Sequence, residues 1–166
     1  MPRYAFSLMH PSISRLWLAF AESDHALAGL PRDPISVFHF CDTPTDANLC
    51  AELVRRGRKR ATAPSLWGFA ARGEPLPCPG DHHVVTDWEG VAQCLIRTTA
   101  VTVVPFIDVT PEHAIAEGEG DGSLEAWRAT HWMYYHRELA GTPFVPTEHM
   151  PIVCEQFTVV YPPPAA

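Results

Sequence analysis

The sequence predicts an α+β domain, because strand-forming segments dominate its middle and C-terminal parts while helices begin at well-marked capping residues. β-branched and aromatic residues, which favour strands, are concentrated in residues 37–40, 81–86, 91–104 and 152–161. Helix-start signals stand at Thr43, Thr110 and Ser123. Strands and helices without a regular alternation are typical of the α+β class. A chain of 166 residues is long enough for one domain with a buried core.

The first part of the chain contains two helix candidates. Apolar residues spaced three to four apart predict an amphipathic helix over residues 14–29, followed by a proline-containing linker over residues 30–36. Thr43 suits an N-cap, Pro44 suits the first helical position, and Gly57 suits the residue just after a helix. A second helix is therefore expected between Pro44 and Gly57.

The second part alternates between strands, turns and helices. Residues 87–90 have the composition of a hairpin turn between a strand over 81–86 and one long or two shorter strands over 91–104. Two further helices are expected, a short one from Thr110 to Gly118 and a longer one from Ser123 to Gly141.

The charge distribution is uneven. A net charge of −7 argues against a surface that as a whole attracts nucleic acid or an anionic membrane. The segment Arg55–Arg60 is nevertheless strongly basic. It is consistent with a solvated helix C-terminus, where cations are favoured, or with a contact to phosphate or carboxylate.

The cysteine pattern indicates reduced thiols. The number of cysteines is odd and no pair has the Cys-x-x-Cys spacing, which favours neither a disulfide framework nor a zinc site. No apolar run is long enough to cross a bilayer. We therefore expect a cytoplasmic protein with no membrane partner. The cysteines are Cys41, Cys50, Cys78, Cys94 and Cys154.

Lys59 is the only lysine, whereas the other eleven basic residues are arginines. A buried lysine can lose its proton and an arginine cannot, so a single lysine indicates either a deprotonable amine or a chance result of composition. Thr62 brings a hydroxyl three residues further on, and a neutral amine beside a hydroxyl can activate a weak nucleophile. Residues three apart in a regular strand face opposite ways, so the segment is expected to be irregular.

Three carboxylates follow the short helix in the stretch Glu117-Gly118-Glu119-Gly120-Asp121. This stretch is consistent with a polar turn, with acid–base chemistry at a carboxylate of raised pKa, or with a divalent cation site. None of the nine histidines stands in a metal-binding motif, and His131 is expected to be a core or helix-face residue. Neither a metal nor another cofactor is predicted.

Gly57, Lys59 and Thr62 fit the pattern Gly-x-Lys-x-x-Thr, with which the chain resembles the ASCH domain family. Further similarity to one bacterial branch lies in residues 40–44, 97–99, 116–121 and 123–128. The match extends over about residues 37–161. We therefore expect a helical extension over residues 1–36, an ASCH domain over 37–161 and a disordered tail over 162–166.

The resemblance implies a PUA-like fold, a small β-barrel of five or six strands with flanking helices. The helix over residues 45–56 is expected to pack on this barrel. The expected barrel core is Val84, Leu95, Ile96, Val101, Val103 and Val159.

The resemblance also implies a cleft over the barrel, with the Lys59 segment on its floor and a nucleoside or RNA as ligand. Some relatives are amidohydrolases that remove the acetyl group from N4-acetylcytidine. Their lysine, threonine and glutamate correspond to Lys59, Thr62 and Glu117 here. Other relatives are proposed to bind or cleave RNA, for which the same cleft and the segment Arg55–Arg60 would serve.

On this basis Lys59 is expected to act as general base, with its pKa lowered by partial burial and by the neighbouring arginines Arg58 and Arg60. Thr62 is the expected nucleophile, and Glu117 the residue that orients the amine or passes on its proton. The net charge favours a small nucleoside over a long RNA. The substrate-binding candidates are Arg58, Ser65, Trp67, Arg97 and Glu119.

Overall fold

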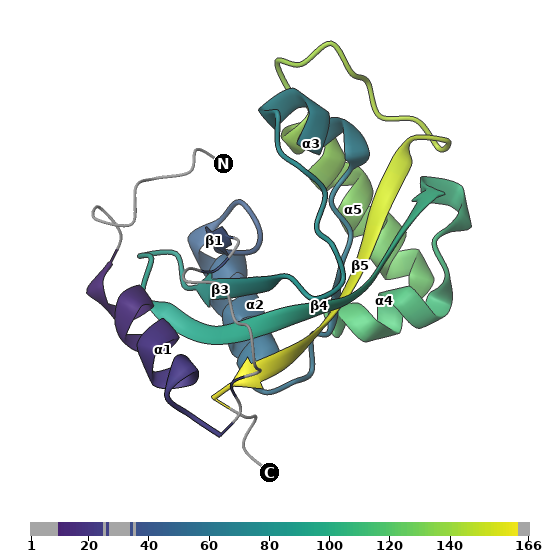
Figure 1. Ribbon diagram of the computed structural model, residues 1–166. Helices are drawn as coiled ribbons and strands as arrows, with labels where there is room; N and C mark the ends of the chain where they lie inside the picture. The colour runs from purple at the N-terminus through teal and green to yellow at the C-terminus, as the bar shows by residue number, and fades with distance from the viewer. Residues whose placement is uncertain (1–9, 25, 27–33, 35, 163–166) are drawn as a thin grey trace.

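Five strands form one mixed sheet with helices on both of its faces (Figure 1). The computed structural model describes residues 10–24, 26, 34 and 36–162. The strand order is β1-β3-β4-β5-β2; β1 pairs with β3 in parallel, and the other pairs are antiparallel. The strands are β1 (Ser36–Phe38), β2 (Ala61–Thr62), β3 (His82–Thr86), β4 (Ala92–Pro105) and β5 (Pro151–Tyr161).

Capping residues define most of the helix starts. The side chains of Thr43, Thr110 and Ser123 accept hydrogen bonds from backbone N–H groups three residues on, as the sequence predicted. A short 3-10 helix, η2 (Phe106–Asp108), follows β4. The α-helices are α1 (Pro11–Ala21), α2 (Pro44–Arg55), α3 (Leu66–Arg72), α4 (Pro111–Glu117) and α5 (Leu124–Glu138).

Two helices differ from expectation. Helix α1 begins earlier than predicted, because His10 caps it and Pro11 stands at its first position, and it ends at Ala21. Helix α3 was not predicted, since its seven residues are too few to show an apolar stripe. The predicted linker over residues 30–36 and the predicted tail over 162–166 lie largely outside the described residues.

The two faces of the sheet pack against different helices. On β5, Phe157 and Val159 face the cluster around α2, which also contains Ile96. Cys154 lies on the opposite face, where the α5 residues Trp127 and Tyr135 cover it. Near the other end of the sheet, the apolar residues that pack against α1 include Val84, Leu95 and Val160.

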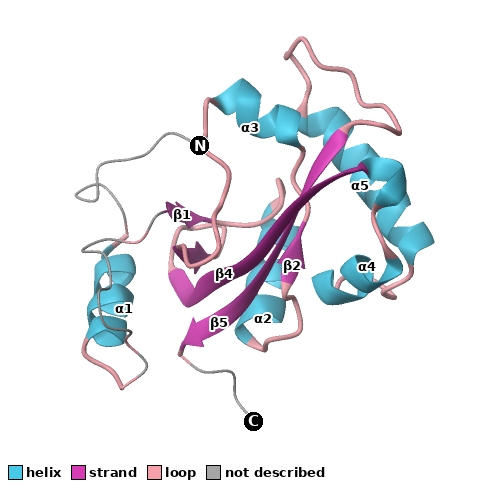
Figure 2. Cartoon of the chain, turned by 45° about the vertical axis from the view of Figure 1, so that its right-hand side comes forward, coloured by secondary structure: helices cyan, strands magenta, loops and turns pink. Residues whose placement is uncertain are grey.

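The expected closed barrel is not confirmed. The sheet is open, with the three-residue strand β1 and the two-residue strand β2 at its two edges (Figure 2). Leu95 and its neighbour Ile96 are both buried but belong to clusters on opposite faces, so they do not share one interior. Val103 is 45% exposed, which corrects its placement in the core.

A helix that crosses a bilayer must be long and apolar. Within the described ranges, none of the helices combines the length and the apolar character that crossing a bilayer requires.

We expect Val84→Ala and Val103→Ala to differ in their effect on stability, although both remove the same atoms. Val84 is fully buried, so its truncation should lower the free energy of unfolding by ~2 kcal/mol from lost burial and the cavity left behind. Val103→Ala should change it by less than ~0.5 kcal/mol. Urea denaturation of the two variants measures the difference, and equal losses would contradict the observed packing.

Candidate functional site

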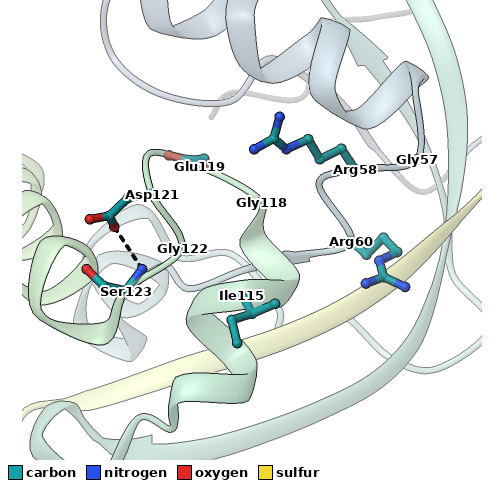
Figure 3. Close-up of a pocket in the computed structure, with 9 residues that line it drawn as sticks. All are labelled: Gly57, Arg58, Arg60, Ile115, Gly118, Glu119, Asp121, Gly122 and Ser123. Atoms are coloured by element: carbon teal, nitrogen blue, oxygen red, sulfur yellow. Dashed lines mark hydrogen bonds between the residues drawn. The ribbon is translucent and has the colours of Figure 1, made fainter.

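A cleft of about 540 Å³ opens where the chain leaves α2 and where α4 joins α5 (Figure 3). Arg58 and Arg60 lie on one side of it, and the stretch from Glu119 to Ser123 forms the other side. The cleft therefore brings cationic and anionic side chains face to face. Its lining residues are Gly57, Arg58, Arg60, Ile115, Gly118, Glu119, Asp121, Gly122 and Ser123.

Two glycines allow the helix ends beside the cleft to approach each other. Gly57 follows α2 and Gly118 follows α4, both in the left-handed region with φ of 69° and 67°. A Cβ atom at Gly118 would lie 2.6 Å from the backbone oxygen of Arg58, so no other residue fits there without displacement. The backbone N–H of Arg60 then donates to the carbonyl oxygen of Ala116 at 2.8 Å. This contact sets the Lys59 segment against the end of α4.

The Lys59 amine does not line the cleft and is almost completely buried, with 1% of the residue exposed. It donates hydrogen bonds to Glu117 Oε2 at 2.8 Å and to Glu119 Oε1 at 2.5 Å. The amine also lies 5.2 Å from the centre of the Phe40 ring, within the range of a cation–π contact. We refer to Lys59, Glu117 and Glu119 as the ion cluster.

The expected lowering of the Lys59 pKa is wrong. Burial does lower the pKa of the amine, but the attraction of Glu117 and Glu119 outweighs burial, and the pKa lies well above its usual range. Lys59 is therefore an ammonium group in the resting protein at neutral pH. In the sequence only the arginines adjacent to Lys59 are evident, whereas the dominant charges come from residues 58 and 60 positions away.

Glu117 is held in its ionised form from several sides. Its Oε1 atom accepts a hydrogen bond from Trp127 Nε1 at 2.8 Å, and His131 Nε2 lies 3.4 Å from the same oxygen. Burial raises the pKa of Glu117, but Lys59 and His131 more than compensate, so the pKa is well below normal. Burial also lowers the pKa of His131, whose ring stacks on Trp127 at 4.0 Å between centroids. Glu117 is thus a fixed anion.

Glu119 connects the ion cluster to the cleft. Its side chain is 30% exposed, it lines the cleft, and it also accepts a weak hydrogen bond from Cys50 Sγ at 3.5 Å. With two carboxylates on one ammonium, the cluster has a formal charge of −1. Asp121, in the same acidic stretch, accepts from the Ser123 backbone N–H at the start of α5. In the described part of the chain, no group of three potential metal ligands comes together.

Thr62 is the predicted nucleophile, and the structure places it in the sheet. It is half-buried in β2, directly opposite Glu155 of β5. Among the described residues, no hydrogen bond joins the Thr62 hydroxyl to the Lys59 amine. The segment from Arg58 to Arg60 is irregular, as the spacing of Lys59 and Thr62 predicted.

The other predicted substrate-binding residues divide into two groups. Arg58 and Glu119 line the cleft. The hydroxyl of Ser65 caps α3 and donates to Glu138 Oε2 at 2.7 Å, and Trp67 stacks on Phe144 at 5.3 Å. Arg97 is paired with His82 in the β3–β4 ladder. None of Ser65, Trp67 and Arg97 is among the residues that line the cleft.

Two residues that contact the Glu117 carboxylate, His113 and Trp127, were not predicted as site residues from the sequence. His113 stands one turn before Glu117 on α4, with its Nε2 atom 3.6 Å from Glu117 Oε1. The i, i+4 spacing of these two residues was a signal for this contact. Trp127 is the second such residue, because its indole N–H requires a partner when it is buried and Glu117 provides it.

Comparisons with known proteins identify the class of domain. The family model of the ASCH domain matches residues 36–161. The structure is similar to that of an ASCH domain from Lactobacillus crispatus JV V101, with a TM-score of 0.82 and 30% identity, covering 95% of this chain and 99% of that one. It is also similar to protein EF3133 from Enterococcus faecalis V583, with a TM-score of 0.77 and 29% identity, covering 89% and 87% of the two chains. No curated protein sequence gives a significant match.

The fold and the cleft define an α+β domain of the PUA-like class, for which RNA binding and hydrolysis are the functions to consider. The chain belongs to the ASCH domain family.

We expect Lys59→Met to destabilise the protein strongly, because two carboxylates lose their buried counter-charge. Breaking a buried ion pair on one side costs ~3–5 kcal/mol, which urea denaturation at pH 7 should show. Arg60→Met, which changes the exposed neighbour, should leave the free energy of unfolding near that of wild type.

The pH dependence of this effect has a definite sign. In wild type the Glu117 pKa is depressed, so its stabilisation is present above pH 4.5, the ordinary pKa of a glutamate, and decreases as the pH falls below it. In Lys59→Met the unpaired Glu117 should have a raised pKa, so that variant should gain stability between pH 7 and pH 5. If the free energy of unfolding decreased in parallel in both proteins between pH 7 and pH 5, this account would be wrong.

Proposed function

We propose that this protein is an amidohydrolase that removes the acyl group from an N-acylated nucleoside, with N4-acetylcytidine as the first substrate to test. The observation that carries the proposal is the buried Lys59 ammonium, held by Glu117 and Glu119, of which Glu119 reaches the cleft. Amide hydrolysis requires a proton donor for the leaving nitrogen, and a fixed ammonium group supplies one. The family includes enzymes of this kind, as the sequence resemblance implied.

The cleft suits a small ligand. Its volume of about 540 Å³ is within the range of ~300–1,000 Å³ that is usual for small-molecule sites. The net charge of −7 also favours a neutral nucleoside over a polyanion.

The charge state of the ion cluster changes the roles expected from the sequence. Thr62 attacks the acyl carbon, and Lys59 gives its proton to the departing amine. Once neutral, Lys59 accepts a proton from the water that hydrolyses the acyl-threonine, so it acts first as acid and then as base. Glu117 keeps the amine in place, and Glu119 adjoins the substrate in the cleft.

We expect Lys59→Arg to lower kcat/KM for N4-acetylcytidine by ~10²–10⁴-fold, because arginine keeps the charge but cannot exchange the proton. Thr62→Val should abolish turnover and Thr62→Ser should retain part of it. Thr102→Val, an exposed threonine on β4, is the matched control and should be fully active. Chromatography of cytidine release measures these rates. Full activity of Lys59→Arg would contradict the mechanism, and an inactive wild type would contradict the substrate class.

RNA binding is the second candidate, and the two cleft arginines favour it. Arg55 and Arg56 form ion pairs with Glu52 on the surface of α2, whereas Arg58 and Arg60 form no ion pair with any described residue. Two unpaired guanidinium groups on one side of a cleft are suited to phosphate.

If RNA binds in the cleft, Arg58→Ala combined with Arg60→Ala should weaken binding and reduce the slope of log K against log[salt] by about 1.4, or about 0.7 for each lost phosphate contact to a single strand. The matched control combines Arg55→Ala with Arg56→Ala, and should have a smaller effect because both side chains are already paired with Glu52, which offsets one of their two charges. Fluorescence anisotropy with a short single-stranded RNA measures both. Absence of wild-type binding at low salt would exclude this candidate.

A further inference from the structure

Glu155 is a buried carboxylate that the mechanism above does not use. It is 7% exposed, lies on β5, and is the direct cross-strand partner of Thr62 in the antiparallel β2–β5 pair. Directly paired residues lie on the same face of a sheet, with Cβ atoms ~4.5–5.5 Å apart. Glu155 is therefore the ionisable side chain that the sheet register places beside the proposed nucleophile.

A row of hydrogen bonds leads to this carboxylate across the sheet. Thr98 Oγ1 donates to Glu155 Oε1 at 2.6 Å, His83 Nε2 lies 3.2 Å from Thr98 Oγ1, and Ser36 Oγ lies 2.8 Å from His83 Nδ1. The row starts on β1 and passes over β3 and β4 to β5. The register places Thr62 on the same face, at the far edge of the sheet.

The chemistry of the groups fixes the direction of this row. An ionised Glu155 only accepts, so the single hydroxyl proton of Thr98 is directed to it. His83 Nε2 must then donate to the Thr98 oxygen, and because burial lowers the His83 pKa to about 4, the neutral ring accepts from Ser36 at Nδ1. Each hydroxyl or imidazole thus donates toward Glu155, and such bonds polarise one another. The row orients the carboxylate and stabilises its charge.

Burial makes Glu155 a stronger base than an exposed glutamate. Burial raises its pKa, the hydrogen bond from Thr98 lowers it in part, and the charge of Asp81 raises it further. Thr98 occupies one of the carboxylate's lone-pair positions, and a carboxylate has about four. It therefore retains the capacity to accept a proton from a second hydroxyl.

We infer that Glu155 is the general base that activates Thr62, and that Ser36, His83 and Thr98 are positioning residues for it. This inference rests on the proposed amidohydrolase function, in which Lys59 is charged and cannot begin the reaction as a base. The Thr62 oxygen forms a bond to the acyl carbon while its proton passes to Glu155. The carbon–nitrogen bond breaks as Lys59 protonates the leaving amine. In deacylation, water loses a proton to Lys59, and Glu155 returns its proton to the Thr62 oxygen.

The pH profile of kcat/KM tests the inference. Glu155→Gln should lower the rate by ~10²–10⁴-fold. Thr98→Val should move the acidic limb to higher pH, because the lost hydrogen bond no longer stabilises the carboxylate, whereas Thr98→Ser should keep the wild-type limb. Glu125→Gln, at the exposed start of α5, is the matched control. A Glu155→Gln variant within threefold of wild type, or an unmoved limb in Thr98→Val, would overturn the inference while the amidohydrolase function stands.

A second readout does not depend on the natural substrate. Thr62 should be acetylated by p-nitrophenyl acetate, and peptide mapping by mass spectrometry should locate the adduct. Labelling should be lost in Thr62→Val and Glu155→Gln. In Thr98→Val, the acidic limb of the labelling rate plotted against pH should shift to higher pH. If wild type hydrolyses no acylated nucleoside but labels in this way, the proposed substrate fails and the role of Glu155 stands. If wild type neither hydrolyses acylated nucleosides nor becomes labelled at Thr62, both the amidohydrolase function and the role of Glu155 are overturned.

Discussion

The contact of the Lys59 ammonium with Glu117 and Glu119 is the interaction on which the site depends. It joins the segment after α2 to the end of α4, and through Glu117 it reaches Trp127 of α5. A buried charge is costly unless it is paired and hydrogen-bonded, and here both carboxylate partners come from one stretch that is distant from Lys59 in the sequence. The same contact that holds these segments together also holds the proton on Lys59.

This charge state determines how the chemistry is divided. A lysine between two carboxylates is a poor base and a well-placed acid, so a nucleophile nearby needs another proton acceptor. The sheet supplies a candidate in Glu155, which is separated from the ion cluster and supported by its own row of donors. In the proposed mechanism the acid and the base thus occupy different environments, one dominated by opposite charges and the other by burial, and such a separation of pKa values is typical of enzymes that use both.

Signals between neighbouring residues predicted the local structure well. They failed for features that depend on residues distant in the sequence. The caps at Thr43, Thr110 and Ser123 were predicted because capping depends on neighbouring residues. The open sheet was not predicted, since strand-rich segments suit either a closed barrel or an open sheet, and the family resemblance implied the barrel. The family resemblance pointed to Lys59 and Glu117, but the direction of the Lys59 pKa shift depended on partners that only the fold brings close. Ser65 showed the same limit, because its hydroxyl caps a helix that the sequence did not predict.

The glycine at position 118 has a consequence for the order in which the molecule assembles. This glycine lets α4 contact the Arg58 backbone, and the ion cluster forms beside that contact. The cluster joins Lys59 to residues 58 and 60 positions away, so the chain must close long loops before the contact stabilises it. A chain still emerging from the ribosome with α2 complete lacks the counter-charges for its only lysine. The amine remains hydrated until α4 arrives, so the ion cluster forms together with the tertiary fold.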